Sequence, residues 1–317
     1  MEAFRALPAE VSGWIVDCTF GGGGHTDFLL QSLSKLPGGH RHRVLGVDQD
    51  PMALERGRQR FQKEIAEGRL VLIQAHFSEH AAWKAAVSGP IFGLLADLGF
   101  SSDQMDDLDR GLSFQSDGPL DMRMDPARPM TAESLLQEIS ERDLEKILSE
   151  FGEERFAGRI ARALVEDRKR GKLPKTPKEL GERIRQAVPP DPNSRIHPAT
   201  RSFQALRIAV NQELEELDAL LRDGILTLEP GGRVAILSFH SLEDRKVKDV
   251  FRIPAKGETG DFRNLTPKPI VADDDEVRAN PRSRSAKLRV AERLAPGEVV
   301  RKKKEYPAHK PKKKDDE

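Results

Sequence analysis

Cysteine is almost absent from this sequence, because Cys18 is the only one among 317 residues. A single cysteine excludes an internal disulfide framework and any zinc cluster that is built on cysteines. The sequence also has no His-Glu-x-x-His segment and no Walker phosphate loop, so it lacks the motifs of helical zinc hydrolases and of P-loop nucleotidases. We therefore expect no metal site.

Long apolar runs are missing as well. No stretch approaches the ~18 residues that a membrane-spanning helix needs, and the run Ile91–Phe100 is interrupted by Asp97. The first ten residues, MEAFRALPAE, lack the basic and then apolar pattern of a secretory signal. The composition, 37% hydrophobic and 33% charged, supports a folded core. We expect a soluble, cytoplasmic protein with no membrane partner.

The net charge is zero, but charges of one sign are segregated along the chain. Residues 97–125 carry eight Asp against two Arg, a net charge of −6. Residues 153–207 carry 14 Lys and Arg against seven Asp and Glu, a net charge of +7. Residues 301–317 carry eight basic and four acidic residues, and we expect this tail to be disordered. The pattern favours an anionic partner that binds one face, with ordinary solvated helix surface as the alternative.

Short buried strands alternate with helices in the first hundred residues, which predicts an α/β fold with a parallel sheet and helices on both faces. The expected strands are 14–19, 43–48, 70–75 and 93–99. From about 103 to 198 only loop and helix patterns occur, with helices near 131–152, 153–171 and 176–188. The pattern continues with a long amphipathic helix from Thr200 through Leu221, a strand at 233–239 and a helix from Ser241. A loop-rich stretch at 254–285 and a final strand at 286–294 follow.

This pattern predicts a discontinuous core with an insertion, since length alone suggests about two domains or one core with an insertion. We expect residues 1–102 and 199–300 to form the core, and 103–198 to form an inserted helical domain.

The strongest local motif runs from Asp17 to His25 and contains four consecutive glycines between a strand and a helix. Glycines allow a ligand to approach the backbone closely, and the carboxyl ends of parallel strands are where nucleotide cofactors bind. A pyrophosphate disfavours a neighbouring carboxylate such as Asp17, and Thr26 replaces the third glycine of the dinucleotide motif. The loop therefore favours a cationic cofactor such as S-adenosylmethionine. Asp48, at the end of the second strand, is placed to accept the ribose hydroxyls.

The fourth strand ends in Asp97-Leu98-Gly99-Phe100. Acceptors that bind the hydrogens of an exocyclic amine localise the nitrogen lone pair for methyl transfer, and a nearby aromatic ring stacks on the base. Asp97 and Phe100 have the D-x-x-F spacing of this arrangement, although an Asp that caps its own turn is an equally good interpretation. For His240, at another strand end, we expect a structural role, and for Cys18 that of a small core residue.

Several ordered motifs together resemble one family, the bacterial small-subunit rRNA cytosine-N4 methyltransferases known as RsmH or MraW. The matching segments include VDCTFGGGGHT (16–26), GVDQDP (46–51), DLGFSSDQ (97–104), RGLSF (110–114), DGPLDMRMD (117–125), GEERF (152–156), HPATR (197–201), SFHSLEDR (238–245) and NPRSRS (280–285). The resemblance covers about residues 12–295.

The resemblance implies a class I S-adenosylmethionine-dependent methyltransferase, with a Rossmann-like, mostly parallel sheet interrupted by an all-helical domain that helps to recognise the RNA substrate. The implied reaction is methyl transfer from S-adenosylmethionine to N4 of a cytidine in the decoding region of 16S rRNA, with small-subunit rRNA or the 30S particle as the partner. The family's cofactor contacts fall here on Gly23, Gly24, His25, Asp48, Phe77, Asp97 and Gln104, and Asp97 is the implied catalytic residue.

Two further hypotheses stay open. Only 13 residues precede Trp14, and the family's segment of the type His-x-x-Val-Leu-Leu is missing there, which would suit a non-catalytic RNA-binding or ribosome-assembly protein that retains the fold. A nicotinamide-dependent oxidoreductase would use the glycine loop and Asp48, but Asp17 and Thr26 both oppose it.

Overall fold

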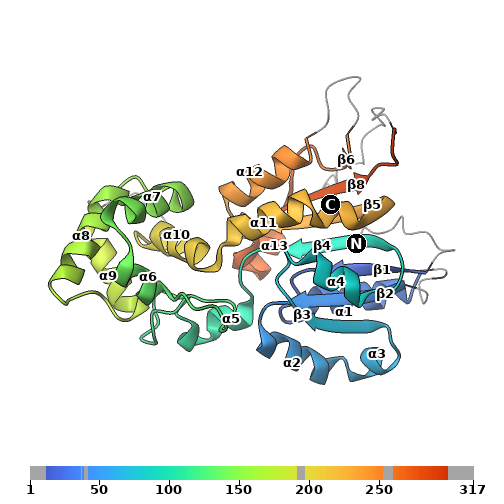
Figure 1. The fold of residues 1–317 in the computed structure, drawn as a ribbon, viewed down its shortest axis with the longest axis horizontal. Coiled ribbons are helices and arrows are strands. Elements are labelled where there is room, and N and C mark those ends of the chain that lie inside the picture. Colours follow the sequence, from blue (N-terminus) through green and yellow to red (C-terminus); the bar gives the residue numbers. More distant parts are fainter. Residues whose placement is uncertain (1–11, 37, 39–41, 191–196, 253–259, 299–317) are drawn as a thin grey trace, which may run out of the picture.

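The computed structural model describes residues 12–36, 38, 42–190, 197–252 and 260–298 (Figure 1). One part of the described chain is a sheet with helices packed on it, and the other is a group of helices at the carboxyl ends of the parallel strands (Figure 1). The basic tail, 301–317, lies outside the described residues.

The sheet is mixed and mostly parallel. Its strands are β1 (Gly13–Asp17), β2 (His42–Asp48), β3 (Leu70–Gln74), β4 (Ile91–Asp97), β5 (Leu228–Ser238), β6 (Phe262–Asn264), β7 (Ile270–Val271) and β8 (Lys287–Arg293). The order is β3-β2-β1-β4-β5-β8-β6, and β7 also pairs with β8. The first five strands run parallel, and β8 is antiparallel to β5. The strand order reverses between β1 and β4, and ligands of doubly wound sheets bind at such a switch point.

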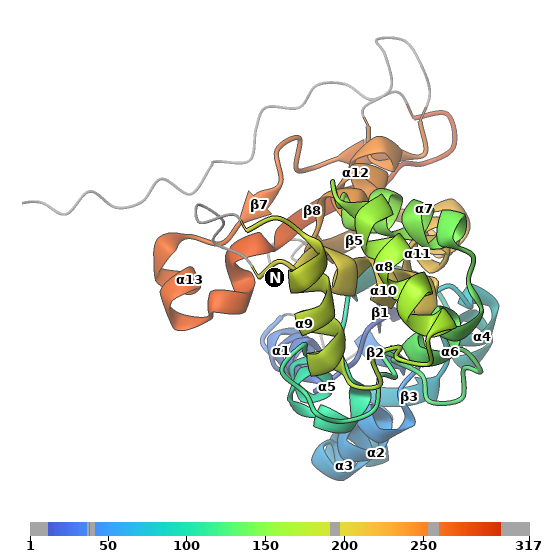
Figure 2. The ribbon, with the colours of Figure 1, turned by 90° about the vertical axis from the view of Figure 1, so that its left-hand side faces the viewer.

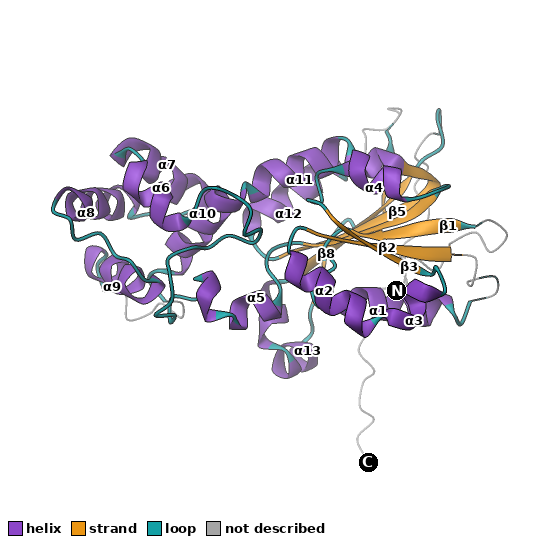
Figure 3. Ribbon diagram, turned by 60° about the horizontal axis from the view of Figure 1, so that its bottom comes forward, coloured by secondary structure: helices purple, strands orange, loops and turns teal. Residues whose placement is uncertain are grey.

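Helices cover both faces of the sheet because its central strands are apolar on both sides. In β1, Trp14 and Val16 face one core, whereas Ile15 faces the other, as the two-residue period of a strand requires. The first face packs against α4 (His80–Ala86), α11 (Glu213–Arg222) and α12 (Ser241–Val250), with the 3-10 turn η4 (Gly224–Thr227) between the last two. The second packs against α1 (Gly24–Leu33), α2 (Pro51–Arg60) and α3 (Gln62–Ala66) (Figure 3). The predicted α/β architecture is confirmed.

The segment after β4 contains helices and loops and no strand among its described residues up to α10, as predicted. It contains α5 (Ser102–Asp106), the 3-10 turn η3 (Leu108–Arg110), α6 (Ala132–Glu138), α7 (Glu141–Gly152), α8 (Ala157–Lys169), α9 (Pro177–Ala187) and α10 (Thr200–Asn211) (Figure 2). The expected helix 131–152 is two helices, because Ile139 is extended and Ser140 caps a new helix by accepting from the Asp143 amide. Thr176 and Glu179 form a capping box at the start of α9.

The expected long helix from Thr200 through Leu221 was wrong as a single element. Gln212 adopts a left-handed conformation with φ of 53°, which ends α10 and starts α11. The apolar side chains of α10 pack with the helical group, whereas Leu217 and Leu221 of α11 pack on the sheet. We therefore propose Gln212 as the junction between the two cores, in place of the expected 198/199 boundary.

The stretch expected to be loop-rich, 254–285, also holds short elements among its described residues. Besides β6 and β7 it forms α13 (Asp274–Ala279) and the 3-10 turn η5 (Pro281–Ser285), which lead directly into β8. No helix within the described ranges has both the length and the apolar composition that crossing a membrane would require.

Candidate active site

A pocket of about 640 Å³ lies at the carboxyl ends of the parallel strands, where the helical group meets the sheet. Its wall is built from distant parts of the chain: the glycine loop, the turns after β2 and β4, the start of α11, and the α13–η5 segment. Among the residues that the sequence predicted, six line the pocket: Gly24, His25, Asp48, Phe77, Asp97 and Gln104. Gly23 is not among the residues that line it.

Gly23 and Gly24 have different structural roles in the glycine loop. Gly23 has φ of 76°, and a Cβ there would lie 2.7 Å from the Phe61 ring and 2.9 Å from the Phe20 ring. Gly23 is therefore required by packing beneath the loop. A Cβ on Gly24 would meet no atom within 4 Å, so this backbone borders open space where a ligand can approach.

Asp17, which the sequence analysis placed beside the cofactor, is fully buried under the loop. It accepts a hydrogen bond from the Thr26 hydroxyl (2.8 Å) and a longer one from the Thr19 amide (3.4 Å). Burial raises the pKa of Asp17, although the bond from Thr26 opposes the shift. Asp17 thus organises the glycine loop, and Thr26 is its partner. The carboxylates that line the pocket come from other positions.

Asp48 faces the pocket from the end of β2. Its Oδ2 accepts from the Gly21 amide (2.6 Å) and its Oδ1 from the Asp50 amide (2.8 Å), which fixes the orientation of the carboxylate. Burial raises the pKa of Asp48 to about 6, against the lowering effect of these two hydrogen bonds. Each oxygen retains acceptor capacity for a second donor, such as a ribose hydroxyl.

Asp97 and His25 form a pair across the pocket floor. His25 Nε2 donates to Asp97 Oδ2 at 3.1 Å, and this hydrogen bond raises the pKa of His25 despite its partial burial. The Asp97 amide donates to Thr19 Oγ1 (2.7 Å). Asp97 Oδ1 is buried and has no hydrogen-bond partner among the described residues. An unsatisfied buried acceptor is unfavourable, so Oδ1 is a position where a ligand donor would bind.

Gln104 lies between the turn after β4 and the turn after β2. Its Oε1 accepts from the Ser101 amide (2.9 Å) and its Nε2 donates to Asp50 Oδ2 (3.2 Å). Arg110 donates to the same Asp50 oxygen (2.8 Å) and to the Met124 carbonyl (3.0 Å). Asp50 therefore connects the turn after β2 to the first part of the helical segment, which follows β4.

Four phenylalanines are among the residues that line the pocket: Phe20, Phe77, Phe100 and Phe239. Phe77 follows β3 and packs against the sheet core. Phe100 lies in the D-x-x-F turn, with the Arg207 guanidinium 4.9 Å from its ring centroid. Both Glu213 oxygens hold Arg207 in place, at 2.7 and 2.9 Å. One face of Phe100 is thus covered by a fixed cation.

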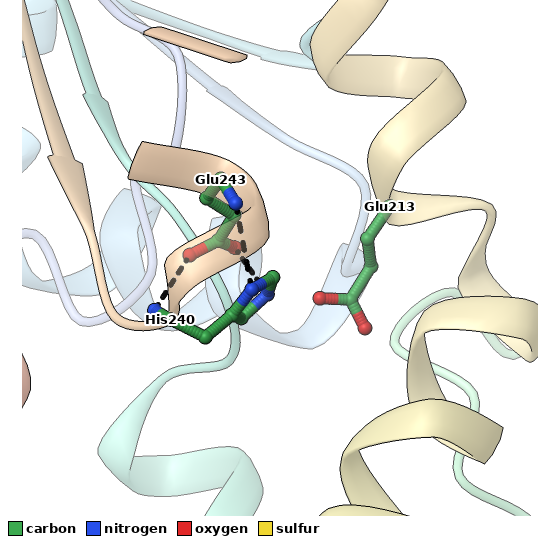
Figure 4. A group of neighbouring side chains, drawn as sticks. All are labelled: Glu213, His240 and Glu243. Carbon is green, nitrogen blue, oxygen red and sulfur yellow. Dashed lines mark hydrogen bonds and ion pairs between the residues drawn. The ribbon is translucent and has the colours of Figure 1, made fainter. Parts of the chain in front are cut away.

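Glu213, His240 and Glu243 form the one group in the described ranges whose side chains could hold a metal ion, with ligand atoms within 4.8 Å of one another (Figure 4). His240 caps α12 by accepting from the Glu243 amide through Nδ1, so its Nε2 carries the proton and lies 3.2 Å from Glu243 Oε1. Glu213 is already paired with Arg207. Glu243 Oε2 accepts from the Phe239 amide (2.8 Å), whereas His240 Nε2 is buried without a hydrogen-bond partner among the described residues. The structural role of His240 and the absence of a metal stay predictions.

Sequence reasoning missed the part of the wall that comes from α11 and from the C-terminal segment. The missed residues include Asn211, Glu213, Glu216, Phe239, Glu243, Glu276, Asn280, Arg282 and Ser283. The motifs SFHSLEDR and NPRSRS were a signal, since they contributed to the family resemblance without an assigned role.

The pocket fits a cationic nucleoside such as S-adenosylmethionine by three observations. Open space lies beside the Gly24 backbone, Asp48 presents an oriented carboxylate, and Asp97 Oδ1 is a buried acceptor without a partner. Cys18 is excluded as a nucleophile because burial raises the pKa of its thiol well above the usual range.

Comparisons of sequence with known proteins identify one family. The sequence model of the MraW methylase family matches residues 1–294. A ribosomal RNA small subunit methyltransferase H from Halorhodospira halophila is 45% identical over 309 residues, covering 92% of each chain. A protein of the same name from Sorangium cellulosum is 44% identical over 300 residues, covering 94% of this chain and 90% of its own. An rRNA methylase structure from Streptococcus thermophilus aligns with a TM-score of 0.36 at 15% identity, over 90% of this chain and 92% of that one.

Proposed function

The chain belongs to the MraW methylase family, and from this premise we propose that it methylates N4 of a cytidine in the decoding region of 16S rRNA. The fold is the class I methyltransferase fold with a helical insertion. Methylation of small-subunit ribosomal RNA follows from relatives at 44–45% identity over most of the chain. The proposal adds the methylated atom, N4 of cytidine, and its place in the decoding region.

The observation that carries the proposal is the unpartnered Oδ1 of Asp97. In cytosine the N4 lone pair is delocalised into the ring, so the amine is a poor nucleophile. A carboxylate oxygen that binds an N4 hydrogen draws the nitrogen toward tetrahedral geometry and stabilises the positive charge that develops on it. His25 orients Asp97 through Oδ2 and leaves Oδ1 for this bond. No covalent enzyme intermediate is needed.

Bound S-adenosylmethionine would supply an electrophilic methyl group on a positively charged sulfur. We propose that Asp48 accepts its ribose hydroxyls and that Phe77 packs on its adenine. Gly24 and His25 would border its methionine end. Gln104 would act through the Ser101 turn, since both ends of its amide already bond to protein groups. Gly23 would support the loop from below.

The arginines near α8 support an RNA substrate. Arg155, Arg159 and Arg162 are exposed, while Ile160 and Leu164 of the same helix are buried in the helical core. An exposed arginine face on a firmly packed helix suits phosphate contacts, which position RNA without reading its sequence.

Labelled S-adenosylmethionine and small-subunit particles test the proposal directly. We expect label in N4-methylcytidine at one nucleotide, identified by mass spectrometry of the digested rRNA. Asp97→Ala should lower the rate at least 10²-fold by removing the acceptor. Asp97→Asn, which keeps one acceptor oxygen, should retain more activity. Near-normal turnover of the alanine variant would remove Asp97 from the reaction.

The non-catalytic alternative gains no support from the comparisons, whose named relatives are methyltransferases. Calorimetry separates the two hypotheses. RNA binding without any S-adenosylmethionine binding would favour the non-catalytic protein.

A further inference from the structure

The pocket extends beyond the residues that the proposed function uses. The cofactor contacts proposed above come from the glycine loop and from the turns after β2, β3 and β4. Another part of the wall is made by Asn280, Arg282, Ser283 and Ala286, together with Phe239, which follows β5. None of the cofactor contacts proposed above involves these residues.

The wall segment is held rigidly. Asn280 Oδ1 accepts from the Arg282 amide (3.2 Å), and Ser283, which is buried, donates through Oγ to the Asn280 carbonyl (2.8 Å). The next residues enter β8, where Lys287 pairs with Ser238 of β5. The wall therefore continues from the same strand pair whose end carries Phe239, and its position relative to the strand ends is fixed.

The charges of this part of the wall differ from those at the strand ends. The cofactor side presents the carboxylates Asp48 and Asp97, whereas this side presents the exposed guanidinium of Arg282. A target nucleotide has a neutral base with an amine at one end and a phosphate at the other. When the base lies beside Phe239 with its amine at Asp97, a phosphate of the same nucleotide stays outside the base site, and an exposed arginine of the pocket wall can bind it bidentately.

We propose that the Asn280–Ala286 segment forms the subsite for the nucleotide to be methylated, with Arg282 binding a phosphate that flanks the target base. This inference rests on the proposed function and adds the residue that positions its substrate. Glu276 of α13 lines the same wall, and its negative charge opposes a phosphate there. The subsite therefore predicts opposite effects for removing these two charges.

Steady-state kinetics with small-subunit particles that lack the modification test the subsite. We expect Arg282→Ala to raise KM for the particle about tenfold, with the S-adenosylmethionine Kd, measured by calorimetry, within twofold of wild type. The slope of log Kd for RNA against log salt should fall by about one unit, the value for one phosphate contact. Arg282→Lys should recover part of the loss, and Glu276→Gln should lower KM.

Arg284 is the matched control, because it is exposed in the same turn but does not line the pocket. Arg284→Ala should change KM less than threefold. An equal loss in both variants would indicate a diffuse basic surface and overturn the subsite. A raised cofactor Kd with unchanged RNA binding would also overturn it, since Arg282 would then bind the cofactor's carboxylate. If the wild-type protein forms no N4-methylcytidine, the proposed function itself fails, and this outcome is seen before any variant is made.

Discussion

Asp50 should be the most sensitive polar residue outside the reaction centre. It is 1% exposed, it caps α2 through the Met52 amide (3.0 Å), and its Oδ2 receives Arg110 and Gln104. Asp50→Asn keeps the cap, because Asn caps helices as well as Asp, but it removes the charge opposite a largely buried Arg110. Breaking a buried pair from one side costs about 3–5 kcal/mol. We expect a loss of about 3 kcal/mol in the free energy of unfolding.

Urea unfolding followed by circular dichroism measures this loss. With a slope of about 1–3 kcal/mol per molar urea, the midpoint should fall by roughly 1–3 M. The matched control is Asp117→Asn, because Asp117 pairs with Lys178 at 3.0 Å while both side chains are mostly exposed. A surface pair contributes about 0–1 kcal/mol. Asp50→Asn should also raise the S-adenosylmethionine Kd, since the Asp50 carboxylate holds Gln104, which in turn bonds to the Ser101 amide in the turn after β4.

A double-mutant cycle identifies the partner. Combining Asp50→Asn with Arg110→Met should recover about 2 kcal/mol relative to the sum of the single losses. Equal midpoints for the Asp50 and Asp117 variants, or additive losses in the cycle, would refute the view that Asp50 joins the turn after β2 to the helical segment.

Three further predictions concern two residues with positive φ, Gly23 and Gln212, and the raised pKa of Asp48. Gly23→Ala should destabilise the protein by about 2–4 kcal/mol in urea unfolding and abolish cofactor binding, because a Cβ would clash with Phe61 and Phe20 at a positive φ. Gln212→Gly should stabilise it by up to about 1 kcal/mol, since glycine adopts φ of 53° without strain; a lower midpoint would contradict this. Because the pKa of Asp48 is raised to about 6, cofactor Kd by calorimetry should rise as pH falls through 6, while Asp48→Asn should show no such rise.

Protonation of Asp48 has opposite effects on cofactor binding and on the stability of the fold. Its pKa in the folded protein lies above the ordinary value of 3.8, so the folded state binds this proton more tightly than the unfolded chain. Protonation of Asp48 therefore stabilises the fold as pH falls from 6 toward 3.8. Weaker cofactor binding in that window cannot come from unfolding driven by this group.

The sheet and the acidic residues at its strand ends could be predicted because both depend on local patterns. Apolar strands that end in Asp48 and Asp97, with a glycine loop after the first strand, place their polar ends at one edge by the geometry of a parallel sheet alone. The two-residue period of Trp14, Ile15 and Val16 likewise fixes the two cores.

The helix break at Gln212 could not be predicted, because its cause is tertiary. Nothing in the side chain of glutamine favours a left-handed conformation, and the apolar spacing runs through it without interruption. Here Asn211 donates to the Met122 carbonyl (2.8 Å) and accepts from the Met124 amide (2.8 Å), so contacts across 87–89 residues hold the end of α10. The same break brings Asn211 and Glu213 to the pocket.

The role of Asp17 was misjudged because sequence gives position along a strand but not the depth of a side chain. Several pocket carboxylates are matched by cations that tie elements together: Glu213 by Arg207, Glu216 by Arg128, and Asp103 by Arg56. Such pairs contribute little field at the pocket centre. Among the described residues, Asp48 has no cationic side-chain partner and Asp97 has only His25. The negative field that would attract a sulfonium therefore comes from the ends of β2 and β4, the two strands on either side of β1, and not from the number of acidic residues in the wall.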